Sequence, residues 1–208
     1  MARRTKEEAQ ATRSTIMSMA LELFCRQGLA RTSLTDIAKA AGVTRGAIYW
    51  HFKDKEELFA ALWQELCLPL SHLVAASIDS EEADPLGKLQ LFLVTVLRSV
   101  AGSQVHQQMF TILFNLGAQS SELLKLHAQM TQLHSEYLAD LSQALQNAIR
   151  RGQLPSEINL QRAVTLLHCS LYGFILKWLH YPNAFDLEQE AEPLVASLIY
   201  TLKHGLAP

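Results

Sequence analysis

The sequence predicts an all-α protein of about nine helices. Only 9 Gly and 6 Pro interrupt the 208 residues, so long stretches lie between residues that break helices. Apolar side chains recur at the three- and four-residue spacing of a helix with one buried face, and no segment alternates as a β-strand does. Residues that cap helices precede several of these stretches: Ser33, Thr44, Asp54, Asp84, Asn159 and Asp186.

The first predicted helix covers residues 7–27 and ends at Gly28, a residue suited to a helix C-terminus. Ser33 and Asp36 form a capping box that opens a second, short helix, with Asp in place of the usual Glu. Gly42 ends this second helix.

Two more capping residues follow closely. Thr44 caps a short helix over residues 45–51. Asp54 and Glu57 form a second capping box, which opens a long helix over residues 55–78.

Five helices are predicted in the rest of the chain. They cover residues 86–101, 105–116, 121–151, 160–180 and 187–204. Asp84 followed by Pro85 is a favourable helix start, and Asp186 with Gln189 resembles a third capping box. Pro193 falls inside the last pattern, so we expect a kink there or a later start.

Residues 33–53 fit a helix-turn-helix. The small Ala38 and Ala41 allow two helices to cross closely, and Gly42 suits a turn that requires positive φ. Three apolar residues are placed to lock the two helices together: Ile37, Val43 and Ile48. An ordinary pair of packed helices is the alternative interpretation.

The distribution of charge favours a polyanionic partner for the first part of the chain. Residues 1–53 carry nine Lys and Arg against four acids, whereas the remainder carries nine basic and sixteen acidic residues. The second helix of the motif projects Arg45, Tyr49 and His51 outward, where they can reach a major groove. We therefore expect a DNA-binding domain over 1–54 and a second domain over 55–208, with helix 55–78 as the connector.

The sequence predicts a cytoplasmic protein. Acidic residues follow the basic N-terminus, where a signal peptide would need apolar ones. The most apolar segment, residues 86–100, is too short and too polar to span a bilayer. The three cysteines form no CxxC pair, and their odd number fits a reducing compartment.

No motif indicates an enzyme, because the chain has no Gly-rich phosphate loop, nucleophile elbow or HExxH. His127 and His134 are seven residues apart, too far for an ordinary metal-binding pair. Neither a cofactor nor a metal is expected. A structural DNA-binding protein without a ligand is a further alternative, but it would not need such a large helical region behind the first domain.

Two segments resemble the signature of the TetR family of one-component repressors: LARTSLTDIA from Leu29 and GVTRGAIYWHFK from Gly42. The opening MARRTKEEAQATR, with DPL from Asp84 and RGQLP from Arg151, resembles the AcrR/TtgR-like branch, whose members repress multidrug efflux operons. The match is dense in the N-terminal domain and elsewhere is mainly one of helix count and spacing. It implies that residues 55–208 bind a ligand and form a dimer.

The resemblance implies DNA contacts from the helix-turn-helix, from the segment before the first helix and from the start of helix 55–78. The residues are Arg3, Arg4, Ser33, Thr44, Arg45, Gly46, Tyr49, Trp50, His51 and Lys55. Thr44 and Lys55 would hold phosphates and Arg45 a base or phosphate, while Phe52 would pack beneath the recognition helix. One helix reads few base pairs, so a dimer on a palindrome is expected, with half-sites roughly 34–36 Å apart or a multiple of that.

The resemblance also implies a pocket for a hydrophobic or aromatic inducer in the second domain. Its expected lining is Trp63, Leu66, Phe92, Leu93, Val96, Phe110, Leu113, Phe114, His134, Leu167, His168 and Leu171. A solid core is the alternative for the apolar residues, and a satisfied core histidine is the alternative for His134 and His168. The branch commonly carries an acid shortly after the position of Leu113. Its absence here favours neutral ligands over cationic drugs.

The last two helices, about 160–180 and 187–204, are expected to dimerise, with intramolecular packing as the alternative. The residues are Leu160, Val164, Leu171 and Ile175 on one helix and Leu194, Leu198, Ile199 and Leu202 on the other.

The expected function is repression of a multidrug efflux operon, relieved when an inducer acts through helix 55–78 and shifts the protein to a state that no longer fits the operator. The alternatives are a regulator of another pathway that senses a metabolite, or a redox sensor that uses Cys67.

Overall fold

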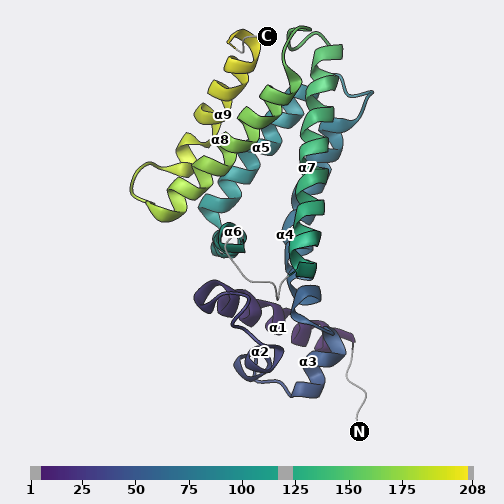
Figure 1. Ribbon diagram of the computed structural model, residues 1–208, viewed down its shortest axis with the longest axis vertical. Coiled ribbons are helices and arrows are strands. Elements are labelled where there is room, and N and C mark those ends of the chain that lie inside the picture. Colours follow the sequence, from purple (N-terminus) through teal and green to yellow (C-terminus); the bar gives the residue numbers. More distant parts are fainter. Residues whose placement is uncertain (1–5, 117–123, 206–208) are drawn as a thin grey trace. The chain divides into compact units, whose positions relative to one another are not determined.

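The computed structural model describes residues 6–116 and 124–205 (Figure 1). Within these two ranges the chain is all helical, as predicted, and has no strand. The helices are α1 (Lys6–Gln27), α2 (Leu34–Ala40), α3 (Arg45–His51), α4 (Lys55–Ile78), α5 (Pro85–Gly102), α6 (Gln104–Leu116), α7 (Leu124–Arg150), α8 (Leu160–His180) and α9 (Leu187–His204).

The predicted helix starts agree with the structure to within one residue where the structure describes them. The expected start of the seventh helix at 121 and its separation from the sixth at Gly117 lie outside the described residues. A later start of the last helix is wrong, because α9 begins at Leu187 and contains Pro193 within its length. The capping side chain of Asp186 accepts a hydrogen bond from the Gln189 N–H at 3.0 Å and fixes this start.

Only the first of the three predicted capping boxes is complete. The Ser33 hydroxyl accepts from the Asp36 N–H at 3.1 Å, and the Asp36 carboxylate accepts from the Ser33 N–H at 3.0 Å. Asp54 accepts from the Glu57 N–H at 2.8 Å, but the Glu57 carboxylate accepts from the N–H of Lys53, one residue before the cap.

At α9 the side-chain amide of Gln189 donates to the Asp186 carboxylate at 2.8 Å instead of returning to the backbone. All three helix starts therefore have a side-chain cap, whereas the reciprocal backbone bond forms only at α2.

The chain forms two compact units. The first comprises residues 1–66 and 108–128, and the second comprises residues 67–107 and 129–208, so α4, α6 and α7 each contribute to both. This division concerns packing, and the functional boundary between 54 and 55 stays a prediction.

In the first unit α1 packs on α2, and α2 packs on α3 (Figure 1). The core includes the rings of Phe24 and Phe59, whose centroids are 6.3 Å apart.

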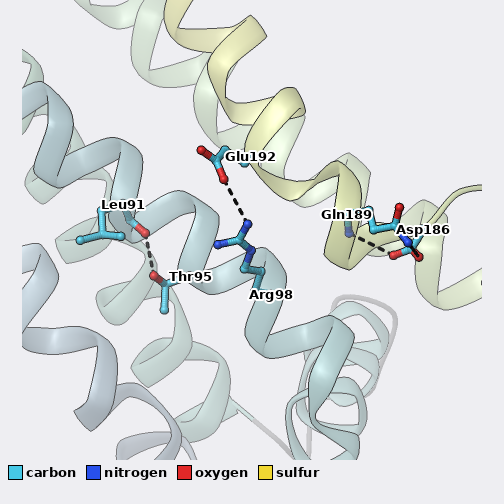
Figure 2. Close-up of polar contacts among 6 residues, drawn as sticks. All are labelled: Leu91, Thr95, Arg98, Asp186, Gln189 and Glu192. Atoms are coloured by element: carbon cyan, nitrogen blue, oxygen red, sulfur yellow. Dashed lines mark hydrogen bonds and ion pairs between the residues drawn. The ribbon is translucent and has the colours of Figure 1, made fainter.

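The second unit is built on α5, which packs along α9 and also contacts α8. Leu97 and Val100 of α5 and Val195 of α9 are fully buried. Figure 2 shows the Arg98 guanidinium of α5 reaching the Glu192 carboxylate of α9, at 3.1 Å. Both side chains are largely exposed, so apolar burial rather than this ion pair holds the two helices together.

Candidate DNA-binding interface and effector region

The turn between α2 and α3 is built by a Schellman motif. Gly42 has φ of +65°, the left-handed conformation that glycine adopts without strain. The Gly42 N–H donates to the Lys39 carbonyl at 3.2 Å and the Val43 N–H donates to the Ala38 carbonyl at 3.0 Å. These bonds end α2 and turn the chain into α3.

Buried apolar residues then fix α3 against α2. Ile37 and Ile48 are fully buried and Ala38 nearly so, while Val43 is half-buried. Phe52 is only 2% exposed, so its ring is buried, and its predicted place beneath α3 stays a prediction. Because the inner face of α3 is anchored in this way, its opposite face is directed to solvent.

The exposed face of α3 carries most of the predicted DNA contacts. Trp50 is 73% exposed and Tyr49 is 46% exposed, and Arg45 lies with its guanidinium 5.6 Å from the centroid of the Tyr49 ring. The His51 ring meets Trp50 edge-on, with 4.6 Å between the ring centroids. Thr44 caps the helix by accepting from the Ala47 N–H at 3.1 Å. Thr44, Arg45 and Gly46 are exposed, so one short helix presents cationic, aromatic and hydroxyl groups together.

Two predicted DNA-contacting residues, Ser33 and Lys55, have hydrogen-bond partners inside the protein. The Ser33 hydroxyl donates to the Asp36 carboxylate at 2.6 Å, and this bond holds the pKa of Asp36 below its usual value. The Lys55 ammonium donates to the carbonyls of Leu29 at 3.1 Å and Ala30 at 3.2 Å. Lys55 therefore ties the start of α4 to the loop after α1. Arg3 and Arg4 lie outside the described residues.

The positive charge of the first unit is less available than the sequence suggests. Arg13 pairs with Glu65 at 2.6 Å and lies 5.2 Å from the centroid of the Phe52 ring. Arg31 donates to the Gln27 carbonyl at 2.8 Å. The spacing of 52 residues between Arg13 and Glu65 gave no local signal for their pairing. Because Arg13 is neutralised by Glu65, it adds less positive charge to the surface than the count over residues 1–53 suggests.

A cluster of aromatic and imidazole rings lies in the second unit. His168 of α8 is half-buried, and its ring centroid is 4.8 Å from that of His134 and 5.7 Å from that of Tyr137 on α7. Burial, and next the neighbouring His134, lower the pKa of His168. His134 is exposed, so it is not a core histidine.

Sequence reasoning missed Tyr137. The available signal was its helical spacing, three residues after His134 and four before the buried Leu141.

The other predicted ligand-contacting residues divide between the two units. Phe92, Leu93, Val96, Leu167 and Leu171 are buried in the second unit, so the structure places them in its core. Trp63, Leu66, Phe110, Leu113 and Phe114 belong to the first unit and are half-buried. Phe110 and Phe114 contact each other, with ring centroids 6.0 Å apart. Whether any of these residues line a pocket stays a prediction.

Comparison with known proteins agrees with the helix-turn-helix geometry. The sequence model of the tetR family of bacterial regulatory proteins matches residues 16–62. A second family model, for the C-terminal region of MAATS-type transcriptional repressors, matches residues 84–204. The chain is 38% identical over 199 residues to the HTH-type transcriptional regulator AcrR of Shigella flexneri, covering 96% of this chain and 93% of AcrR. The chain belongs to the TetR family.

Other TetR-family proteins are similar over nearly their whole length. The regulator TtgR of Pseudomonas putida is 39% identical over 195 residues, with 94% of this chain and 93% of TtgR covered. Among solved structures, NalD of Pseudomonas aeruginosa, the secondary repressor of the MexAB-OprM multidrug efflux pump, superposes with a TM-score of 0.82 at 30% identity, covering 96% of this chain and all of NalD. The SmeT–triclosan complex, whose SmeT is from Stenotrophomonas maltophilia, gives a TM-score of 0.82 at 26% identity, with 96% and 95% of the two chains covered.

As a TetR-family member, the chain is a transcriptional regulator and not an enzyme, as the sequence predicted. Regulators of this family bind operator DNA as dimers and respond to small molecules. No helix among the described residues is long and apolar enough to cross a membrane. Residues 6–116 and 124–205 contain no group of three or more His, Cys, Asp or Glu side chains that could hold a metal ion.

The predicted dimerisation residues serve partly as the core of this TetR-family protomer. Val164, Leu171 and Ile175 of α8 and Ile199 and Leu202 of α9 are buried within the second unit, which supports the alternative of intramolecular packing for these five. The rest of the set, Leu160, Leu194 and Leu198, is half-buried.

The cysteines give little support to a redox sensor. Cys25 and Cys169 are free thiols, and burial raises the pKa of the Cys25 thiol, which disfavours its reactive thiolate. The side chain of Cys67, the residue named for this role, lies outside the part that the structure describes.

Proposed function

We propose that this TetR-family regulator is a cytoplasmic homodimer that represses a multidrug efflux operon and is released from a palindromic operator by a neutral aromatic or hydrophobic small molecule. The observation that carries the proposal is the exposed face of α3. Trp50 is 73% exposed and the adjacent Tyr49 is 46% exposed, so this short, capped helix presents two large aromatic side chains together, as an interaction surface does.

The efflux operon is proposed from the relatives. NalD represses a multidrug efflux pump, and the relatives AcrR and TtgR are regulators that match nearly all of this chain. SmeT, the repressor of a multidrug efflux pump, has been solved with triclosan, an uncharged chlorinated phenol. A neutral aromatic ligand agrees with the absence of an acid from residues 114–119, directly after Leu113.

We assign DNA contacts on each protomer to the ten residues named from the sequence. Arg45, Tyr49 and Trp50 are exposed on α3 and are placed to meet base edges and sugars, while the cap residue Thr44 and the ammonium of Lys55 meet phosphates. The backbone N–H groups at the start of α3 add to the attraction for a phosphate.

Selection of binding sites from random duplex DNA tests the first half of the proposal. The full-length protein should enrich a palindrome whose half-sites lie roughly one or more helical turns apart, at about 34–36 Å per turn. Loss of enrichment by Tyr49→Ala, with an unchanged melting temperature, would place the contact on α3. Enrichment of a single asymmetric site, or of none, would contradict the proposal.

Titration of the protein–operator complex with triclosan tests the second half. The probe should lower operator affinity, because a ligand that favours the free state must reduce binding to DNA by the same factor. An equal concentration of the quaternary cation tetraphenylphosphonium serves as the matched charged control. Equal affinity of triclosan for free and operator-bound protein would rule out this mode of regulation.

The dimer is proposed on the faces of α8 and α9 that point away from the protomer core. On α8 this face carries Leu166, Cys169 and Gly173, and on α9 it carries Leu194 and Leu198, all half-buried or exposed in one protomer. Two helices from each chain would form a four-helix bundle. The two-fold symmetry of such a dimer matches that of a palindromic operator.

The connecting helix α4 supplies the covalent route between the two functions. It starts at Lys55 beside the DNA-binding motif and ends at Ile78, within the second unit. We propose that the ligand shifts the conformational equilibrium of the protein between two positions of this helix. In the state that the ligand favours, the two DNA-binding domains of the dimer no longer fit the operator.

A further inference from the structure

The second unit contains a buried hydroxyl group that has no hydrogen-bond partner among the described residues. The hydroxyl oxygen of Tyr137 on α7 is buried and forms no hydrogen bond to any residue within the described ranges. Burial raises the pKa of this phenol, so the hydroxyl is neutral and keeps its proton as a donor. Buried polar groups in native proteins nearly always have a partner, because an unpaired one costs free energy. The hydroxyl of Tyr137 is therefore suited to a partner that the chain itself does not supply.

Rings from two other helices contact this tyrosine. Its centroid is 6.4 Å from that of Phe92 on α5 and 5.7 Å from that of His168 on α8. His134 and Tyr172 extend the cluster beyond His168, at 4.8 Å and 6.0 Å between ring centroids. The contacts of His168 with Tyr137 and with His134 are edge-to-face, a geometry that an aromatic ligand can also adopt against an aromatic wall.

The groups that contact Tyr137 are neutral and favour an uncharged ligand. The lowered pKa of His168 keeps its imidazole neutral near pH 7, so it can donate or accept one hydrogen bond without adding charge. The competing group is Asp140, one turn further along α7, where burial and then the nearby Glu136 raise the pKa of the carboxyl. A ligand chosen by Asp140 would be a cation, and a ligand chosen by Tyr137 would carry a neutral oxygen.

We propose that the Tyr137 hydroxyl is the hydrogen-bonding anchor that selects neutral aromatic effectors bearing a hydroxyl or carbonyl oxygen. The inference rests on the proposed function, since it concerns the effector that releases DNA. The ligand oxygen pairs with Tyr137 while its ring contacts Phe92 and His168. An analogue without the oxygen leaves Tyr137 unpaired and binds more weakly, because a site built around a polar group rejects a ligand that cannot satisfy it.

A matched pair of probes measures this preference. 1-Naphthol and naphthalene differ by one hydroxyl, and their dissociation constants for the full-length protein can be compared by calorimetry. Wild type should bind 1-naphthol about tenfold more tightly, the ratio that one net hydrogen bond provides. In Tyr137→Phe this ratio should fall towards one while naphthalene binding is retained. Tyr181→Phe removes a hydroxyl from a tyrosine that is 61% exposed and should keep the wild-type ratio.

Thermal unfolding without any probe provides a second readout. Removal of an unpaired buried hydroxyl should leave the melting temperature of Tyr137→Phe equal to that of wild type or higher. A lower melting temperature would mean that the hydroxyl already has a structural partner, and this result overturns the proposal. Tyr181→Phe is again the control.

The remaining outcomes separate this inference from the proposed function. A tenfold preference that persists in Tyr137→Phe overturns the role of Tyr137, even if 1-naphthol releases operator DNA. Tighter binding of the cation ethidium than of 1-naphthol, abolished in Asp140→Asn, also overturns it. Binding with the expected preference but without release of DNA supports the anchor and contradicts the proposed function. Absence of binding by both naphthalene probes to wild type overturns the anchor.

Discussion

The side-chain amide of Asn147 donates to the backbone carbonyl of Ser77 at 3.3 Å, so that α7 caps the last turn of α4. The same amide donates to the Asp79 carbonyl at 3.1 Å, and Asn147 is only 2% exposed. The last carbonyls of a helix have no partner within that helix. Arg151 extends the anchor by donating to the carbonyls of Ser80 and Glu82. The C-terminal end of the connecting helix is thereby fixed within the second unit.

Replacement of Asn147 by Leu should destabilise the protein. Two carbonyl acceptors lose their donor, and each such loss costs roughly 1–3 kcal/mol when the acceptor is buried. Urea unfolding measures the change in free energy, and hydrogen exchange should rise in the last turn of α4. Gln146→Leu makes a similar change at the exposed neighbouring position and is the control. Equal stability of the two variants would show that the Asn147 bonds contribute nothing.

Lys55→Gln should reduce both stability and the salt dependence of operator binding. Loss of the bonds to the carbonyls of Leu29 and Ala30 should lower the free energy of unfolding by about 1 kcal/mol. An ammonium has three donors, so Lys55 can serve these carbonyls and a phosphate together. Loss of one phosphate contact should reduce the slope of log K against log salt by about 0.9. Lys53→Gln, at the exposed position nearby, is the control for stability. An unchanged slope with lower stability would assign Lys55 a purely structural role.

Trp50→Ala should weaken operator binding without destabilising the fold. The side chain is 73% exposed, so its removal should change the free energy of unfolding by no more than about 0.5 kcal/mol. Loss of the apolar area that Trp50 buries against a base or sugar should cost about 1.5–3 kcal/mol of binding. Fluorescence anisotropy with a selected operator measures the affinity, and Tyr181→Ala controls for loss of an exposed aromatic ring. Wild-type affinity in the Trp50 variant would remove this residue from the interface.

Local signals in the sequence predicted the helices and the helix-turn-helix, because caps, turns and periodicity act within a few residues. Thr44, Gly42 and Ile48 follow from residue type and spacing alone, and the structure agrees with each. The partners of Lys55 and Asn147 could not be predicted in this way. Their bonds join residues 26 and 70 positions apart, so they depend on how the helices pack.

The ring cluster around Tyr137 likewise depends on how the helices pack, so local patterns could not predict it. Tyr137, Phe92 and His168 belong to three different helices, and no pattern on a single helix indicates that their rings meet. A buried hydroxyl that lacks a partner can be recognised only after every neighbouring acceptor has been placed. Local patterns therefore predict the helix-turn-helix geometry, whereas the ring contacts of the effector region depend on how three helices pack.

Gly173→Arg should separate dimerisation from folding. A Cβ added at Gly173 would meet nothing within 4 Å in the protomer, so the longer side chain is accommodated unless a second chain lies there. Light scattering should show a shift from dimer to monomer. Operator affinity should fall at least tenfold, because the DNA-binding domain of a monomer contacts only one half-site. Gly102→Arg introduces the same charge at another position without neighbours and is the control. A Gly173 variant that remains dimeric would place the interface elsewhere.

Acid should destabilise the protein in part through His168. Burial and then His134 lower the pKa of His168 in the folded state, whereas the unfolded chain titrates near the ordinary value of about 6.5. Above that value the residue is neutral in both states and its contribution is constant. As pH falls below it, the unfolded chain binds a proton that the folded chain does not, so stability decreases down to the folded pKa.

The difference in unfolding free energy between wild type and His168→Gln isolates this effect. Stability should decline less between pH 7 and pH 5 in the variant than in wild type, as measured by urea unfolding at each pH. His106, whose pKa burial also lowers, and Asp140 titrate in both proteins and largely cancel from the comparison. His72→Gln, at an exposed position of α4, controls for the loss of an imidazole. If the free energies of unfolding of wild type and His168→Gln fall in parallel with pH, the ring cluster tolerates a charged imidazole and this prediction is wrong.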